Sequence, residues 1–216
     1  MSAFDAVLFD LDGTLVDTRS ASWPWFEQTS RAFALGINTR EQFFALFDDN
    51  FFESLAARCG DPEKASAAAQ HFMGLIREHY APPFIAGITE VVRVLAADHT
   101  LAIVSSNMRE TIDRLLHSGG VAAHFAHIYA GDTQPSKSEA IADFLAGRWS
   151  DTGLGRPFDA ERVVLVTDTT GDVGAALASG IRAFGVDWGM HDRQKLIAAG
   201  AVQVASQPQQ LLAWIN

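Results

Sequence analysis

From residue 84 onward, short apolar runs rich in β-branched residues alternate with stretches that have the amphipathic period of helices. This alternation is typical of a parallel sheet with helices on both of its faces. A further apolar run at 6–10 is expected to belong to the same sheet. The sequence therefore predicts an α/β fold, with apolar runs at 100–106, 127–132, 162–168 and 182–188 and helical stretches at 109–120, 137–147 and 171–180.

The segment between the first two predicted strands has a different texture. Residues 18–81 are mostly helical in pattern, contain no convincing strand and end at "APPF" (81–84), whose paired prolines suit an extended linker. We expect residues 1–17 and 82–216 to form the core and residues 18–81 to form an inserted helical domain. Such an insert would lie over the carboxyl ends of the strands, where open α/β sheets bind ligands.

Composition limits the class of partner. The 216 residues carry a formal net charge of −10 and no local basic cluster, which argues against nucleic acid and against an anionic membrane surface. Cys59 is the single cysteine, so no intrachain disulfide forms. Neither a signal-peptide pattern nor an apolar stretch near 18 residues is found, and the expected location is cytoplasmic.

Polar residues follow the apolar runs at the edge where parallel strands would end together. Four of them are carboxylates, and two like charges about 4 Å apart cost roughly 4 kcal/mol at an effective dielectric near 20. A hard cation such as Mg²⁺ would relieve this repulsion, since it prefers oxygen ligands. Serine hydroxyls, loop amides and a lysine supply the opposite polarity for phosphoryl oxygens. These residues are Asp10, Asp12, Asp168 and Asp172, and Ser105, Ser106 and Lys137.

Four segments in order resemble the motifs of the haloacid dehalogenase superfamily of hydrolases: "DLDGT" at 10–14, "VSS" at 104–106, Lys137 at the head of a helix, and "DTTGD" at 168–172. The resemblance spans nearly the whole chain, because residues 18–81 are placed and sized like the helical cap of many members. The tail at 185–215 is similar to that of the phosphoglycolate phosphatase-like branch.

The resemblance implies a Rossmann-like core and a role for each motif residue. Asp10 would be the nucleophile and a Mg²⁺ ligand, and Asp12 the general acid/base and a metal ligand through its backbone carbonyl. An aspartate at position 12 favours phosphoryl transfer over dehalogenation. Phosphate binding would fall to Ser105, Ser106 and Lys137, and the metal site would be completed by Asp168 and Asp172.

The expected activity is Mg²⁺-dependent hydrolysis of a small phosphomonoester through an aspartyl phosphate, with phosphoglycolate as the leading substrate. Two alternatives stay open. A sugar-phosphate phosphomutase would use the same motifs, and a catalytically silent protein could bind phosphate without turnover. The expected partner is a small phosphorylated metabolite, and the chain could be a monomer or a homodimer.

Three local features have a second interpretation or depart from the family pattern. Ser105 could be a helix cap for the stretch that begins near Met108. Thr167 stands where a glycine usually precedes the fourth-motif aspartate, and its β-branched side chain is expected to crowd the turn. The segment 147–159 is longer than most connections and is expected to be a plain surface loop.

Overall fold

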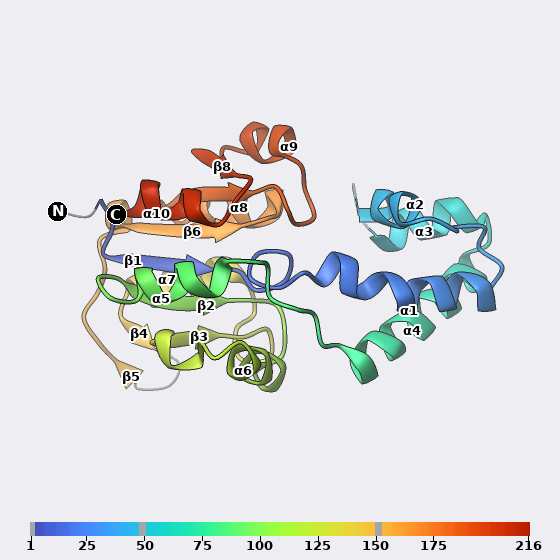
Figure 1. Ribbon diagram of the computed structural model, residues 1–216, viewed down its shortest axis with the longest axis horizontal. Coiled ribbons are helices and arrows are strands. Elements are labelled where there is room, and N and C mark those ends of the chain that lie inside the picture. Colours follow the sequence, from blue (N-terminus) through green and yellow to red (C-terminus); the bar gives the residue numbers. More distant parts are fainter. Residues whose placement is uncertain (1–2, 48–50, 150–152) are drawn as a thin grey trace. The chain divides into compact units, whose positions relative to one another are not determined.

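The chain divides into two compact units, which the computed structural model describes over residues 3–47, 51–149 and 153–216 (Figure 1). Unit 1 combines the N-terminal segment as far as Val16 with Phe84–Asn216, and unit 2 is Asp17–Pro83. Within unit 1, Val16 and Phe84 form an antiparallel bridge, so the chain leaves this unit and returns to it at adjacent points.

Unit 1 is built on a six-stranded sheet in the order β3-β2-β1-β6-β7-β8, in which every neighbouring pair is parallel. This confirms the predicted α/β fold. The two strands that flank β1 are joined to it in matching register, since Phe9 lies opposite both Ile103 and Val166. The strands are β1 (Ala6–Phe9), β2 (Thr100–Val104), β3 (His127–Tyr129), β6 (Val163–Thr167), β7 (Arg182–Val186) and β8 (Gln203–Ala205).

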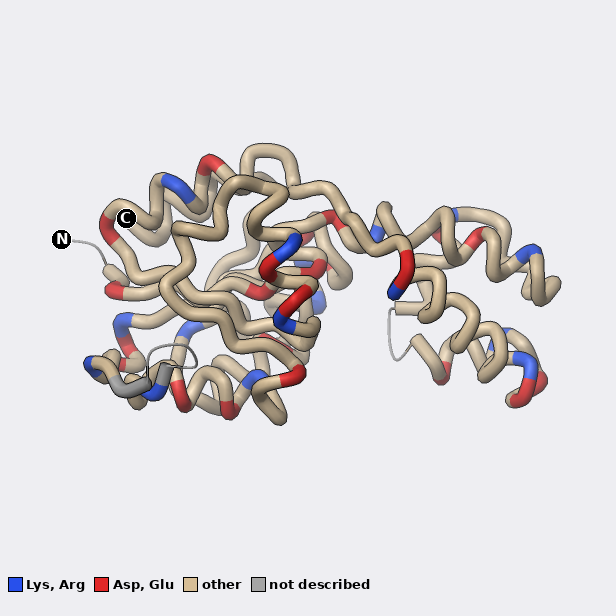
Figure 2. Tube along the Cα trace, turned by 90° about the horizontal axis from the view of Figure 1, so that it is seen from below, with Lys and Arg blue, Asp and Glu red and all other residues tan. Residues whose placement is uncertain are grey.

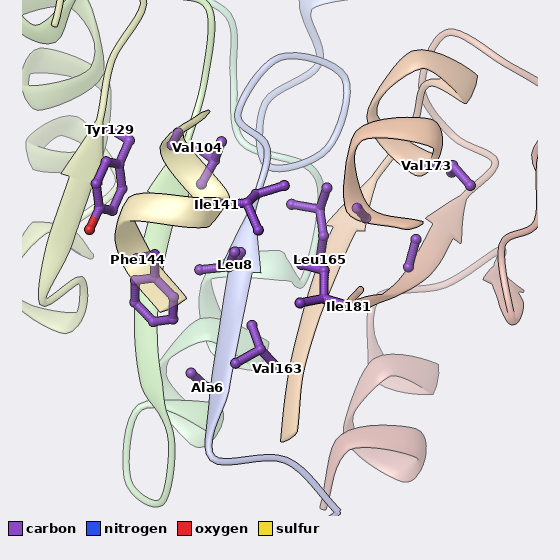
Figure 3. Packing of buried hydrophobic residues seen from close by; sticks show 14 of the residues in the cluster. Ala6, Leu8, Val104, Tyr129, Ile141, Phe144, Val163, Leu165, Val173 and Ile181 are labelled. Atoms are coloured by element: carbon purple, nitrogen blue, oxygen red, sulfur yellow. The ribbon is translucent and has the colours of Figure 1, made fainter. Parts of the chain in front are cut away.

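Helices cover both faces of this sheet. On one face, Ile141 and Phe144 of α7 pack among Leu8 and Leu165 of the central strands (Figure 3), and α8 and α9 extend the same cluster. On the other face, α5 and α10 contact each other, and Trp214 of α10 meets Phe184 of β7 edge to face. The helices of unit 1 are α5 (Ile88–Leu95), α6 (Arg109–Ser118), α7 (Lys137–Leu145), α8 (Thr170–Ala178), α9 (Arg193–Ala198) and α10 (Gln209–Ile215), with 3₁₀ turns at Ala122–His124 and Ala160–Arg162.

Unit 2 consists of helices, and its described residues include no strand. Side-chain caps fix several of its helix starts: Asp17 accepts the N–H of Ser20 ahead of α1, and Asp61 accepts those of Glu63 and Lys64 ahead of α4. The helices are α1 (Thr18–Ala32), α2 (Arg40–Phe44), α3 (Phe51–Cys59) and α4 (Pro62–His79), with a 3₁₀ turn at Ala45–Phe47.

The segment 147–159 differs from the plain surface loop expected for it. Strands β4 (Arg148–Trp149) and β5 (Gly153–Leu154) pair antiparallel, while residues 150–152 lie outside the described part of the chain. Strands of two residues carry too little hydrophobic period to be recognised from sequence, so this pairing was not predictable from the pattern.

Candidate active site

The carboxyl edge of the sheet collects the predicted site residues of unit 1. Asp10 comes directly after β1, and its backbone N–H donates to Val166 O of β6 at 3.0 Å. Ser105 comes directly after β2 and donates its backbone N–H to Tyr129 O. Because β1, β2 and β6 are parallel and in register, the residues that follow them emerge at one edge, and the sheet holds their backbones in place.

Lys137 lies between two buried carboxylates. Its Nζ donates to Asp10 Oδ1 at 2.6 Å and to Asp172 Oδ2 at 2.5 Å. As predicted, Lys137 is the first residue of a helix, where Ser136 provides the N-cap by accepting the N–H of Glu139. A cation is disfavoured by the helix dipole at this position, so the two carboxylates compensate for the unfavourable placement.

Burial and neighbouring charges shift the pKa values of Asp10 and Lys137. Burial raises the pKa of Asp10 well above its ordinary value; Lys137 opposes this rise, while Asp172, Asp168 and Asp12 add to it. For Lys137, burial disfavours the ammonium, but Asp10 and Asp172 outweigh it and raise its pKa above the ordinary value. Lys137 is therefore held as a cation between Asp10 and Asp172.

Asp168 is held by a different set of contacts. Thr14 Oγ1 donates to its Oδ1 at 3.2 Å, and the backbone N–H of Met190 donates to its Oδ2 at 2.7 Å. Burial raises the pKa of Asp168 to about 6, although the Met190 N–H lowers it. A Cβ on Gly13, whose φ is +78°, would lie 2.1 Å from Asp168 Oδ2, and one on Gly189 would lie 2.4 Å from the same atom. Both positions therefore require glycine.

Asp12 is half-buried, and its carboxylate has an amide partner. Asn107 Nδ2 donates to Asp12 Oδ2 at 3.1 Å, and the Asn107 backbone N–H donates to Ser105 Oγ at 3.1 Å. Sequence reasoning missed Asn107, although it comes two residues after the predicted phosphate ligand. It also missed the side-chain contacts of Thr14, which belongs to the quoted "DLDGT" segment.

The helix-cap interpretation of Ser105 is wrong. Helix α6 begins at Arg109, and its N-cap residue Met108 makes no capping bond through its side chain. Asp132 Oδ1, from the segment after β3, accepts the Arg109 N–H at 3.0 Å instead. Asp132 is distant in sequence from α6, so a local sequence pattern does not identify it as the residue that accepts this N–H. The Ser105 hydroxyl bonds instead to the Asn107 N–H, inside the site loop.

The predicted phosphate ligands line one cavity of about 130 Å³ in unit 1. Ser105 is buried there, Ser106 is exposed, and Lys137 connects the cavity to Asp10 through its ion pair. Gly131 closes one side, where a Cβ would lie 2.2 Å from Ser106 O. The volume suits a group of a few heavy atoms, because a water molecule in liquid occupies about 30 Å³.

The donor set of this edge fits a hard divalent cation. Within the described ranges, no three His, Cys, Asp or Glu side chains form a group that could hold a metal ion unaided. Mg²⁺ does not need such a cage, since it is usually bound by one or two carboxylates, waters and a substrate phosphate. Asp172, Asp168 and Asp12 all add to the raised pKa of Asp10, and a bound Mg²⁺ would offset this repulsion between neighbouring carboxylates.

Charged residues elsewhere are mixed in sign. Lys and Arg lie scattered among Asp and Glu along both units (Figure 2). None of the helices over residues 3–47, 51–149 and 153–216 has both the length and the apolar character needed to cross a membrane.

Comparison with known proteins gives a consistent result. The family model described as haloacid dehalogenase-like hydrolase matches residues 7–186. The chain is 29% identical over 203 residues to the "Probable phosphatase IndB" of Dickeya dadantii, covering 89% of this chain and 85% of that protein. It is 28% identical over 214 residues to a phosphoglycolate phosphatase of Synechococcus elongatus, covering 96% and 95%. A haloacid dehalogenase-like family hydrolase of Streptococcus pneumoniae superposes with a TM-score of 0.77 at 21% identity, covering 99% of both chains.

Proposed function

Because the chain belongs to the haloacid dehalogenase-like hydrolase family, we propose that it is a Mg²⁺-dependent phosphatase that hydrolyses a small phosphomonoester through an aspartyl phosphate on Asp10. The observation that carries this proposal is the position of Lys137. Its ammonium contacts the Asp10 carboxylate and lines the cavity that Ser105 and Ser106 also line. The proposed nucleophile and the proposed phosphate-binding cation are therefore neighbours.

In the proposed reaction, Asp10 attacks phosphorus in line with the ester oxygen. The bond from Asp10 to phosphorus forms as the ester bond breaks, and Asp12 gives its proton to the departing alkoxide. Lys137 stabilises the charge on the phosphoryl oxygens, and the Ser105 hydroxyl orients them. Asp12 then takes a proton from the water that attacks the aspartyl phosphate, which releases phosphate and restores Asp10.

The proposed Mg²⁺ ligands are the oxygens of Asp10, Asp168 and Asp172, with the backbone carbonyl of Asp12. When bound, the ion would neutralise charge on the phosphoryl oxygens. The Asp168 carboxylate suits the role of a metal ligand, because hydrogen bonds from the Thr14 hydroxyl and the Met190 N–H fix its orientation. The placement of Asp172 among the ligands stays a prediction, since its Oδ2 accepts bonds from Lys137 and Thr167.

For the substrate, we propose phosphoglycolate. The support is the similarity over 96% of this chain to the Synechococcus elongatus phosphoglycolate phosphatase. In the same proposal, residues 18–81 act as the cap that excludes bulk water and selects the leaving group. A small anionic phosphomonoester also agrees with the size of the cavity beside Lys137.

The decisive experiment is D10N, assayed for Mg²⁺-dependent release of phosphate from a panel containing 2-phosphoglycolate, hexose phosphates and nucleotides. We expect D10N to lose turnover while its circular dichroism spectrum stays that of the wild type, because an amide does not form the acyl phosphate. The matched control is D98N, the same exchange at an exposed aspartate of unit 1.

Two outcomes would contradict the proposal. Substantial residual activity in D10N would remove Asp10 as the nucleophile. Return of phosphate to an isomeric sugar phosphate, with no free phosphate released, would identify the wild type as a phosphomutase.

A further inference from the structure

Thr167 makes two hydrogen bonds at the end of β6, although a glycine usually stands at this place in the family that the chain resembles. Its side chain is fully buried. Its Oγ1 donates to Asp172 Oδ2 at 2.8 Å and accepts the backbone N–H of Thr169 at 3.2 Å. The sequence predicted that Thr167 would crowd the turn. In the structure its hydroxyl takes part in a hydrogen-bond network of the candidate active site.

This network ends at Lys137. Asp172 Oδ2 accepts from both the Thr167 hydroxyl and the Lys137 ammonium, and Lys137 in turn donates to Asp10. Asp172 belongs to the first turn of α8, whereas Thr167 belongs to the sheet. The Thr167 hydroxyl therefore fixes the carboxylate of Asp172 against β6. Strand β6 pairs with β1, and Asp10 comes directly after β1.

The geometry of Thr167 suits such a role. A β-branched side chain in a strand has few χ1 rotamers, so its hydroxyl is held in one direction. A glycine at 167 would remove the hydroxyl donor from Asp172 Oδ2, and the Asp172 side chain could then turn about χ1. Lys137 has four rotatable side-chain bonds, so it depends on its partners for a defined position.

We propose that Thr167 is a positioning residue: its hydroxyl orients Asp172, and through Asp172 it places the Lys137 ammonium beside Asp10. The turnover measurements below rest on the proposed phosphatase function, whereas the structural measurement does not.

Two substitutions separate the hydroxyl from the methyl group of Thr167. T167V keeps the shape and loses both hydrogen bonds, and T167S keeps the hydroxyl and loses the methyl group. We expect T167V to lower kcat roughly tenfold, because a displacement near 1 Å at a catalytic group is costly. We expect T167S to stay within about twofold of the wild type. The KM of T167V should change less than kcat, because Lys137 keeps its charge.

A control shows whether the loss is specific. Ser179, the residue after α8, is half-buried and lies outside the predicted site, and its hydroxyl donates to Ala175 O at 2.9 Å. S179A should therefore remove a side-chain hydrogen bond of unit 1 without the effect on kcat. An equal or larger loss of kcat in T167S than in T167V would mean that Thr167 acts by packing, and the proposal would be overturned. An unchanged kcat in T167V, or an equal loss in S179A, would overturn it as well.

A double-mutant cycle tests the route through Asp172. When D172A is already present, adding T167V should change kcat by less than about twofold, because the carboxylate that Thr167 orients is gone. A further tenfold loss in the double mutant would show that Thr167 acts through another group.

Crystal structures of the T167V and T167S proteins test the inference without turnover. We expect Lys137 Nζ to leave its position between Asp10 and Asp172 in T167V and to keep it in T167S. If the wild type hydrolyses no phosphomonoester, the proposed function fails, and the inference is decided by these structures alone. A Lys137 side chain that is in the same place in both variants would overturn it.

Discussion

The cluster on the α7 face of the sheet in unit 1 and the cluster of unit 2 bury different kinds of side chain. The cluster in unit 1 between the sheet and helices α7 to α9 is mainly aliphatic, with Tyr129 and Phe144 as its large aromatic members. The cluster in unit 2 is richer in aromatic residues, each of which buries a large apolar area. Its aromatic members are Trp23, Phe26, Phe43 and Phe72, with Trp25, Phe33, Phe44, Phe47 and Phe51 packed against them.

The units also differ in buried charge. Among the described residues, the buried carboxylates are Asp10, Asp168 and Asp172, and all three belong to unit 1. Unit 2 holds a space of about 550 Å³, larger than the cavity of about 130 Å³ beside Lys137, but its lining between α3 and α4 is mostly apolar. The proposed active site therefore coincides with the buried carboxylates of unit 1 and not with this larger space.

The largest expected effect concerns the aromatic cluster of unit 2. Phe43 is fully buried, stacks on Phe26 with ring centroids 4.4 Å apart and meets Phe47 edge to face at 5.2 Å. F43A should lower the free energy of unfolding by about 3–5 kcal/mol, because the cavity left among rigid rings cannot collapse. Urea unfolding followed by tryptophan fluorescence measures this. The exposed Phe52 is the control, and an equal loss in F52A would show that the cluster is loosely packed.

The next effect tests the cation of unit 1. K137M should lower kcat roughly 10²- to 10³-fold, as expected when one group that stabilises transition-state charge is removed. Steady-state phosphate release measures it, with circular dichroism to show that the fold persists. K195M is the matched control outside the predicted site. A loss below about tenfold would mean that Lys137 neutralises Asp10 and Asp172 without contacting the substrate.

A third effect concerns the cost of burying charge in unit 1. Because the pKa of Asp168 is raised to about 6 in the folded protein, folding favours its protonated form. Its contribution to stability is complete below pH 4, near the unfolded pKa, and is lost as the pH rises towards 6.

Neutralising Asp168 should therefore stabilise the metal-free protein. We expect D168N to raise the free energy of unfolding at pH 7 by on the order of 2 kcal/mol and to match the wild type near pH 4. The Asn side chain can accept the Met190 N–H and donate to Thr14 Oγ1. Thermal unfolding across this pH range, in the presence of a chelator, gives the measurement. A D168N protein that is less stable than the wild type at pH 7 would contradict the prediction.

The smallest effect concerns the partner of Asp12. N107A should lower kcat about tenfold, because it removes the amide that orients the half-buried Asp12 carboxylate. N107D, which places a second carboxylate beside Asp12, should lower kcat further. If both variants retain wild-type kcat, the Asp12 carboxylate needs no partner to be oriented.

The local hydrophobic pattern was sufficient to predict most strands of the large sheet. It also predicted the edge of that sheet at which the polar residues gather. The β-branched runs became β1, β2, β6 and β7, because strands with both faces covered read as continuous apolar segments. The short strand β3 was expected within the run 127–132, whereas β4, β5 and β8 were not predicted. Their backbone pairing depends on neighbours in space and leaves little trace in the local sequence.

The sequence by itself determined the parallel sheet, the helical nature of residues 18–81 and the set of carboxylates, because hydrophobic period and residue chemistry are properties of the chain. The tertiary structure decided the partners. Lys137 meets Asp10 across 127 residues and Asp172 across 35, and Thr167 proved to be a hydrogen-bond donor to Asp172 where crowding was expected. Such contacts are set by the packing of α7 and α8 on the sheet, so no local pattern could contain them.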